Sequence, residues 1–219
     1  MTGWGPVARH RRIRPARVLE RVMGDLRGEM FDATYIADSG PWDIDRPQPA
    51  LLALAGSGRL AGPVLDVGCG TGEHALMAAA HGLPATGVDL APTAIEKARR
   101  KARERGLAVR FTVGDVLDLP ALGERYRTAL DCGLFHVLDD EERVAFTASL
   151  GAVLEPGGRY HLLCFSEHQP GDWGPRRVRQ QEIRDTFAVG WRVDAIEAAA
   201  LELRGGASAA GWLATITRA

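Results

Sequence analysis

The chain has 219 residues, of which 46% are hydrophobic and 25% are charged, and its formal net charge is −1. These values are ordinary for a soluble globular protein, and the length suits one domain with a sizeable core. The balanced charge excludes a global attraction to nucleic acid or to an anionic membrane, and no apolar run reaches the roughly 18 residues of a membrane span.

The N-terminal segment, residues 1–30, is basic and predicts an amphipathic helical extension. Val18, Val22, Leu26 and Met30 recur every four residues, which is the spacing of an apolar helix stripe. Five of its arginines fall within nine positions: Arg9, Arg11, Arg12, Arg14 and Arg17. A solvated helix or tail explains them most simply, and an arm that binds RNA or phosphate is the alternative. Residues 31–219 are predicted to form one domain.

The cysteines and the N-terminus indicate a reducing compartment. Cys69, Cys132 and Cys164 are odd in number, widely spaced and without the spacing of metal ligands. We therefore expect reduced thiols and no metal site. Because the N-terminus lacks the apolar run of a secretory signal, we expect a cytoplasmic protein.

From Phe31 the helical period is broken, and the chain is predicted to form a loop as far as Pro49. Gly40 and Pro41 forbid a long helix here, because proline lacks the backbone N–H that a helix interior needs. Tyr35 and Trp42 belong to this loop. Aromatic side chains in a loop should cover something, so they either cap the core or line a ligand site.

Beyond this loop, short apolar strands alternate with helices, which is typical of a parallel, doubly wound sheet. The predicted strands are 64–67, 85–89, 109–113, 128–132 and 159–166, and the helices are 49–61, 71–81, 92–105, 140–154 and 178–187. The last two alternating segments, around Trp191 and Trp212, have no helix between them, which predicts an antiparallel hairpin. The fold class is α/β: a Rossmann-like, seven-stranded, mostly parallel sheet with a C-terminal antiparallel hairpin.

The most informative stretch is the first strand of this sheet, which leads directly into Gly68, Gly70 and Gly72 and then into a helix. A strand, a glycine turn and a helix in this order receive adenosine-bearing cofactors. Asp89 ends the second strand about 20 residues later, where a carboxylate accepts from ribose hydroxyls. Asp115 follows the third strand, where a carboxylate can accept from an adenine amino group. All of these residues share the carboxyl edge of the sheet.

The identity of the cofactor depends on Glu73, which occupies the place of the last glycine in the dinucleotide pattern G-x-G-x-x-G. A carboxylate there would repel a pyrophosphate but would tolerate a cationic ligand. This position therefore argues against a nicotinamide dehydrogenase.

The segment from Val64 to His74 resembles the first motif of class I S-adenosylmethionine-dependent methyltransferases. The pattern of that motif is an acidic residue, a spacer residue and G-x-G-x-G. The later motifs of that fold are matched in order by Asp89, Asp115-Val116, Thr128 to Val137 and Leu154 to Arg159. The segment Ser39–Pro49 is similar to the proline-tryptophan-aspartate segment of the thiopurine and thiol (thiocyanate/halide) methyltransferase group and of related bacterial small-molecule methyltransferases. This resemblance implies S-adenosylmethionine as the cofactor.

The resemblance also implies roles for individual residues. Trp42 would cover the cofactor together with Phe31 and Tyr35, Asp89 would bind its ribose, and Asp115 and Val116 would flank its adenine. The other implied cofactor-binding residues are Asp66, Gly68, Cys69, Gly70, Gly72, Leu90 and Cys132.

Methyl transfer from a sulfonium is an in-line displacement that needs orientation but no metal. His136, after the fourth strand, is the candidate general base, with a structural histidine as the simpler alternative. His168 and Trp173 are candidates for the acceptor pocket. We expect a monomer or homodimer that methylates a sulfur or oxygen nucleophile of a small aromatic or apolar molecule. The alternatives are RNA or protein methylation and a non-catalytic, cofactor-binding regulatory protein.

Overall fold

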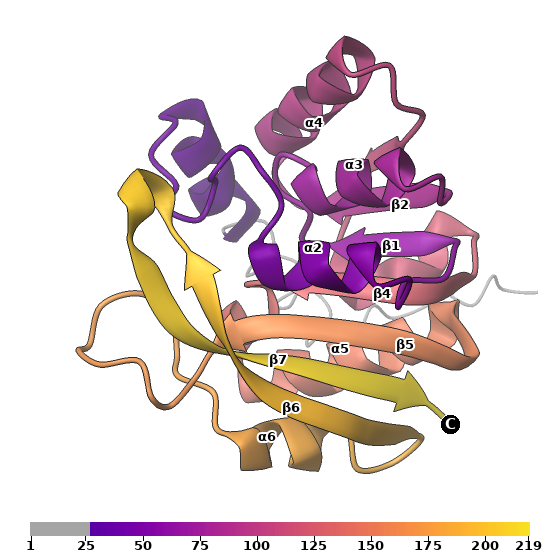
Figure 1. The fold of residues 1–219 in the computed structure, drawn as a ribbon, viewed down its shortest axis with the longest axis vertical. Coiled ribbons are helices and arrows are strands. Elements are labelled where there is room, and N and C mark those ends of the chain that lie inside the picture. Colours follow the sequence, from indigo (N-terminus) through magenta and orange to yellow (C-terminus); the bar gives the residue numbers. More distant parts are fainter. Residues whose placement is uncertain (1–26) are drawn as a thin grey trace, which may run out of the picture.

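The computed structural model describes residues 27–219. Residues 1–26 of the predicted basic extension lie outside this range. Seven strands form one sheet in the order β3-β2-β1-β4-β5-β7-β6 (Figure 1). The strands are β1 (Val64–Val67), β2 (Ala85–Asp89), β3 (Arg110–Val113), β4 (Tyr126–Cys132), β5 (Leu154–Phe165), β6 (Trp191–Glu202) and β7 (Ser208–Arg218). The helices are α2 (Pro49–Gly56), α3 (Glu73–Ala80), α4 (Pro92–Glu104), α5 (Asp140–Val153) and α6 (Gln180–Thr186), with the 3₁₀ turns η1 (Val116–Leu122), η2 (Phe135–Val137) and η3 (Arg204–Gly206).

The predicted fold class is confirmed. Strands β1 to β5 pair in parallel, whereas β7 pairs antiparallel with both β5 and β6. The strand order reverses between β1 and β4, and open α/β sheets bind ligands at such a point. β1 and β2 have the predicted bounds, but β5 begins at Leu154 instead of residue 159 because α5 leads into extended backbone without an intervening loop.

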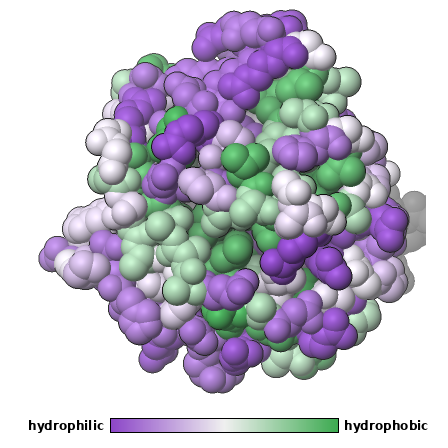
Figure 2. Space-filling model, viewed as in Figure 1, coloured by the Kyte–Doolittle hydropathy of each residue, from purple (hydrophilic) through white to green (hydrophobic). Residues whose placement is uncertain are grey.

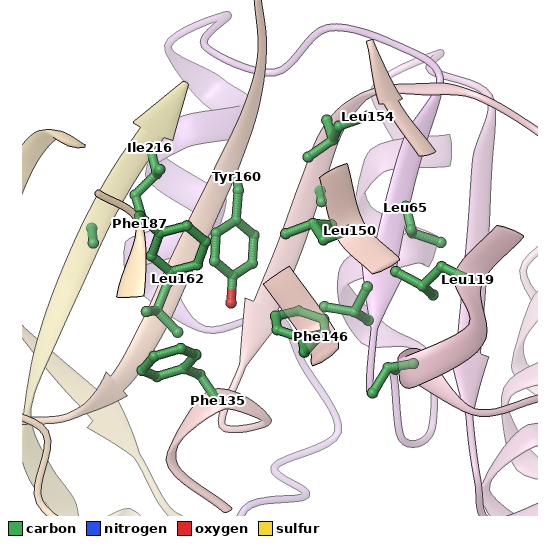
Figure 3. Packing of buried hydrophobic residues seen from close by; sticks show 14 of the residues in the cluster. Leu65, Leu119, Phe135, Phe146, Leu150, Leu154, Tyr160, Leu162, Phe187 and Ile216 are labelled. Atoms are coloured by element: carbon green, nitrogen blue, oxygen red, sulfur yellow. The ribbon is translucent and has the colours of Figure 1, made fainter. Parts of the chain in front are cut away.

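Helices cover both faces of the sheet, which explains why the central strands are almost continuously apolar. On one face α5 and α6 pack over a cluster that includes Phe135, Phe146, Tyr160 and Phe187 (Figure 3). On the other face α2, α3 and α4 bury residues such as Leu51, Leu76 and Ile95. The outer side of α4 is charged, and hydrophilic residues gather over that end of the molecule (Figure 2).

The predicted loop from Phe31 is wrong over its first six residues, because a helix runs through residues 27–36 and crosses the predicted boundary at residue 30. Asp38 ends the helix with a left-handed φ of 51°, and the backbone N–H of Ser39 donates to the carbonyl of Thr34 at 3.1 Å. Gly40 and Pro41 therefore act only after the helix has already stopped. Tyr35 lies on the last helical turn and its side chain is buried.

Candidate functional site

The glycine turn after β1 has a backbone that only glycine adopts without strain. Gly68, Gly70 and Gly72 have φ values of 63°, 51° and 87°, all in the left-handed region. A Cβ added to Gly70 would lie 2.6 Å from the hydroxyl oxygen of Tyr35, and one added to Gly72 would lie 2.6 Å from the ring of Phe111. Tertiary packing thus requires glycine here as strictly as the backbone does.

Two buried aspartates hold this turn in place. The Asp66 carboxylate accepts from the backbone N–H of Ala75 in α3 at 3.0 Å. The Asp89 carboxylate accepts from the backbone N–H of Gly70 at 2.8 Å and from that of Ala91 at 2.9 Å. Burial raises the pKa of Asp89 and raises that of Asp66 to about 8. A carboxylate has about four acceptor positions, so Asp89 retains the capacity to accept from ribose hydroxyls.

The exit from β3 lies beside the end of β2, as the motif order predicts. The backbone N–H of Gly114 donates to the carbonyl of Asp89 at 2.9 Å. Asp115 is exposed and caps η1, since its carboxylate accepts from the backbone N–H of Leu117 at 2.9 Å. Val116 is buried, and Leu90 is half-buried. Two residues predicted to meet the adenosine, Asp89 and Asp115, are therefore close neighbours.

A cavity of about 60 Å³ opens between the glycine turn, the end of β4 and the segment that precedes α2. Its lining includes five predicted cofactor residues: Trp42, Gly68, Cys69, Gly70 and Cys132. The indole N–H of Trp42 donates to the Tyr35 hydroxyl at 3.1 Å, so the two aromatic side chains close one wall. Asp66 and Gly72 shape the turn beneath this lining.

The cavity also contains residues that sequence reasoning did not select. Asp43 accepts from the Thr71 hydroxyl at 3.0 Å, and His74 Nε2 accepts from the backbone N–H of Gln48 at 3.1 Å. Burial lowers the pKa of His74 to about 4, so the ring is neutral. The only local signal for these residues is their position in the segments that flank Trp42 and the glycine turn.

Asp131, at the carboxyl end of β4, is a second residue that the motif reading missed. It is fully buried, accepts from the Tyr160 hydroxyl at 2.6 Å and accepts from the backbone N–H of Leu134 at 2.9 Å. Burial raises its pKa to about 7. Asp131 fixes the start of η2 and thereby the position of His136.

His136 lies at the predicted edge, but its geometry argues against a general base. Nδ1 accepts from the backbone N–H of Phe165 at 3.1 Å, and the ring packs edge-on against the Phe165 ring with centroids 5.1 Å apart. Burial lowers the pKa of His136 to about 3. The imidazole is therefore neutral, and the Nδ1 lone pair that would take a proton is already used.

The structure changes what Glu73 indicates about the cofactor. Its carboxylate is buried and forms ion pairs with Lys101 at 2.9 Å and Arg105 at 2.7 Å. These two cations of α4 and its C-cap keep the Glu73 pKa below its usual value despite burial. Because its charge is balanced, Glu73 does not decide between a pyrophosphate and a cationic ligand.

Comparison with known proteins decides the family. Residues 64–158 match the family described as a methyltransferase domain. The chain is 37% identical over 187 residues to the 2-heptyl-1-hydroxyquinolin-4(1H)-one methyltransferase of Mycobacteroides abscessus, across 81% of this chain and 82% of that protein. The chain belongs to the class I S-adenosylmethionine-dependent methyltransferases. Its cofactor is S-adenosylmethionine.

Two further relatives show how far the likeness extends. A solved structure described as "Conversion of a Disulfide Bond into a Thioacetal Group during Echinomycin Biosynthesis" is 36% identical, with a TM-score of 0.78 over 87% of this methyltransferase and 92% of that chain. A probable thiol methyltransferase 2 of Arabidopsis thaliana is 24% identical over 167 residues, 75% of this chain and 74% of that protein. The predicted resemblance to thiol methyltransferases is therefore partial.

The residues at the site fit this cofactor. The turn presents bare glycine backbone to the cavity, and the exit from β3 adjoins Asp89.

Within residues 27–219, no group of three or more His, Cys, Asp or Glu side chains is placed to hold a metal ion. No helix in that range has the length and apolar character to cross a bilayer.

Proposed function

We propose that this methyltransferase acts on a sulfur or oxygen nucleophile of a small aromatic or otherwise apolar molecule. The observation that carries the proposal is the state of the two histidines beside the glycine turn and after β4. His74 and His136 each use a ring lone pair to accept a backbone N–H, and burial lowers their pKa to about 4 and about 3. Such a site suits an acceptor that ionises near neutrality by itself, as a thiol of pKa ~8.5 or an acidic hydroxyl does.

Aromatic side chains beyond β4 support an apolar acceptor. Phe165, at the carboxyl end of β5, has its ring centroid 5.1 Å from that of His136 and 5.6 Å from that of Trp173. Trp173 is 47% exposed. Arg177 holds the loop that carries it by donating to the carbonyls of Trp173 at 2.6 Å and Pro175 at 2.8 Å. The loop thus offers a preformed aromatic surface next to the reacting edge.

The names of the relatives point to the same chemistry. The Mycobacteroides abscessus relative carries a 1-hydroxyquinolinone in its name, and the Arabidopsis thaliana relative carries a thiol. One is an oxygen nucleophile on an aromatic ring and the other is a sulfur nucleophile. Both kinds of acceptor can ionise without a histidine base.

In this proposal the cofactor supplies an electrophilic methyl group, and the chain binds and orients both reactants. The cofactor contacts come from Trp42, Gly68, Cys69, Gly70, Asp89, Leu90, Asp115, Val116 and Cys132, while Asp66 and Gly72 shape the turn. His136 is assigned a positioning role at the end of β5. We further propose a cytoplasmic monomer or homodimer with small-molecule acceptors and no nucleic-acid or membrane partner, in keeping with its three free cysteines.

Methyl transfer from labelled cofactor into a panel of arylthiols, hydroxyquinolinones, phenols of graded pKa and anilines tests the proposal. We expect transfer to sulfur and oxygen, with the rising limb of kcat/KM against pH following the pKa of each acceptor. Transfer to anilines alone, to RNA alone or to no acceptor at all would contradict it. A rising limb at one pH for every acceptor would assign the proton removal to the enzyme and refute the argument from the histidines.

A further inference from the structure

The segment that carries Trp42 has no regular secondary structure of its own. Residues 38–48, here called the cover segment, contain neither helix nor strand. Asp38 and Asp45 within it adopt left-handed φ values of 51° and 57°, which cost free energy for residues other than glycine. The cover segment therefore depends on contacts from elsewhere to hold its conformation.

The largest group of these contacts comes from the tip of the β6–β7 hairpin, residues 202–206, while Lys97 and Lys101 of α4 pair with Asp38 and Asp45. The backbone N–H of Arg204 donates to the carbonyl of Pro41 at 2.7 Å. The Arg204 guanidinium donates to the carbonyl of Asp43 at 3.2 Å, to the carboxylate of Asp38 at 3.3 Å and also to the Asp38 carbonyl. One arginine thus joins both sides of the turn that contains Trp42.

The hairpin tip also holds the far end of the cover segment. The Gln48 side chain pairs with the backbone of Glu202, donating to its carbonyl at 2.9 Å and accepting from its N–H at 2.8 Å. The Glu202 carboxylate forms an ion pair with Arg46. Residues at both ends of the cover segment are therefore bound to the same hairpin (Figure 1).

The inner side of the cover segment reaches the cofactor cavity. Asp43 accepts from Thr71 in the glycine turn, Gln48 donates its backbone N–H to His74, and Trp42 lines the cavity. Arg204 is not among the lining residues of this cavity, and its side chain is 39% exposed. Arg204 therefore reaches this cavity through its contacts with the cover segment.

We propose that Arg204 is a positioning residue for methyl transfer, which holds the cover segment against the glycine turn before the cofactor binds. A segment that is already ordered loses less conformational entropy on binding, so the hairpin increases cofactor affinity without touching the cofactor. The guanidinium is suited to this task because its planar fork donates in several directions at once. This inference is independent of the identity of the methyl acceptor.

The test compares Arg204→Ala with Arg192→Ala, a variant in β6 of the same hairpin that removes only the exposed ion pair with Asp194. S-adenosylhomocysteine is the probe, and its binding is measured by calorimetry on the full chain without an acceptor. We expect about tenfold weaker binding for Arg204→Ala, the loss of roughly one net hydrogen bond, and unchanged binding for Arg192→Ala. In the ligand-free protein, amide exchange over residues 38–46 should accelerate in Arg204→Ala while exchange in β1 and β4 stays at the parent rate.

Arg204→Lys keeps the positive charge but removes the planar fork of guanidinium donors. A single ammonium group cannot reach the separate acceptors on Asp38 and Asp43, so this variant should bind the probe nearly as weakly as Arg204→Ala. Parent-like affinity of Arg204→Ala, or full rescue by lysine, would overturn the proposal. Equal acceleration of exchange in the cover segment and in β1 would assign Arg204 to general stability and would overturn it as well.

Discussion

Replacement of Gly70 by alanine separates backbone strain from side-chain collision in the glycine turn. Its φ of 51° imposes a cost of ~1–2 kcal/mol on any residue with a Cβ. The new Cβ would also lie 2.6 Å from the Tyr35 hydroxyl oxygen, and overpacking of this kind typically costs a further ~1–3 kcal/mol. We expect Gly70→Ala to lower the free energy of unfolding by about 2–5 kcal/mol and to weaken cofactor binding.

Gly106→Ala is the matched control, because Gly106 has a φ of 64° and no atom within 4 Å of an added Cβ. This variant should lose only the strain energy of ~1–2 kcal/mol. Tyr35→Phe provides a second control, since removal of the hydroxyl leaves a ring carbon at 3.5 Å, an ordinary contact. In the Tyr35→Phe background the cost of Gly70→Ala should therefore fall towards that of Gly106→Ala.

Urea unfolding of the four variants and the parent gives the required free energies, and calorimetry with S-adenosylhomocysteine gives the affinities. We expect a coupling energy of ~1–3 kcal/mol between positions 35 and 70. If Gly70→Ala and Gly106→Ala were equally destabilising, and the Tyr35→Phe background left the cost of Gly70→Ala unchanged, the collision with Tyr35 would be refuted.

Three further predictions address the histidines and the aromatic loop. In His136→Asn the amide oxygen can still accept from the backbone N–H of Phe165, so turnover should stay within about tenfold of the parent. Loss of a general base would instead lower kcat by ~10²–10⁴. Burial lowers the pKa of His161 to about 4. Because the unfolded state then binds more protons below about pH 6.5, this group removes about 2 kcal/mol of stability between pH 7 and pH 5. In urea unfolding the stability lost between pH 7 and pH 5 should be about 2 kcal/mol smaller in His161→Gln than in the parent, and equal losses would disprove it. Trp173→Ala should raise KM for an aromatic acceptor about tenfold by loss of ~1 kcal/mol or more of stacking, with unchanged probe affinity; an unchanged KM would remove Trp173 from the acceptor pocket.

Contacts between distant residues account for the corrections that the structure required. Arg204 and Asp38 are 166 positions apart, and neither residue carries a local pattern that indicates the other. Glu73 finds Lys101 and Arg105 only because α4 packs beside α3 on one face of the sheet. The turn after β4 and the end of β5 likewise bring the His136 ring to a backbone N–H 29 positions away.

The sequence alone was enough to predict the alternation of strands and helices, the glycine turn and the order of Asp66, Asp89 and Asp115 along one sheet edge. These features are local, since periodicity and left-handed backbone angles depend on residues a few positions apart. The packing of the elements against one another sets which charges are balanced, which histidine lone pairs are free and what holds Trp42 over the cavity. Those properties depend on burial and on partners from other elements, and both exist only after the sheet has assembled.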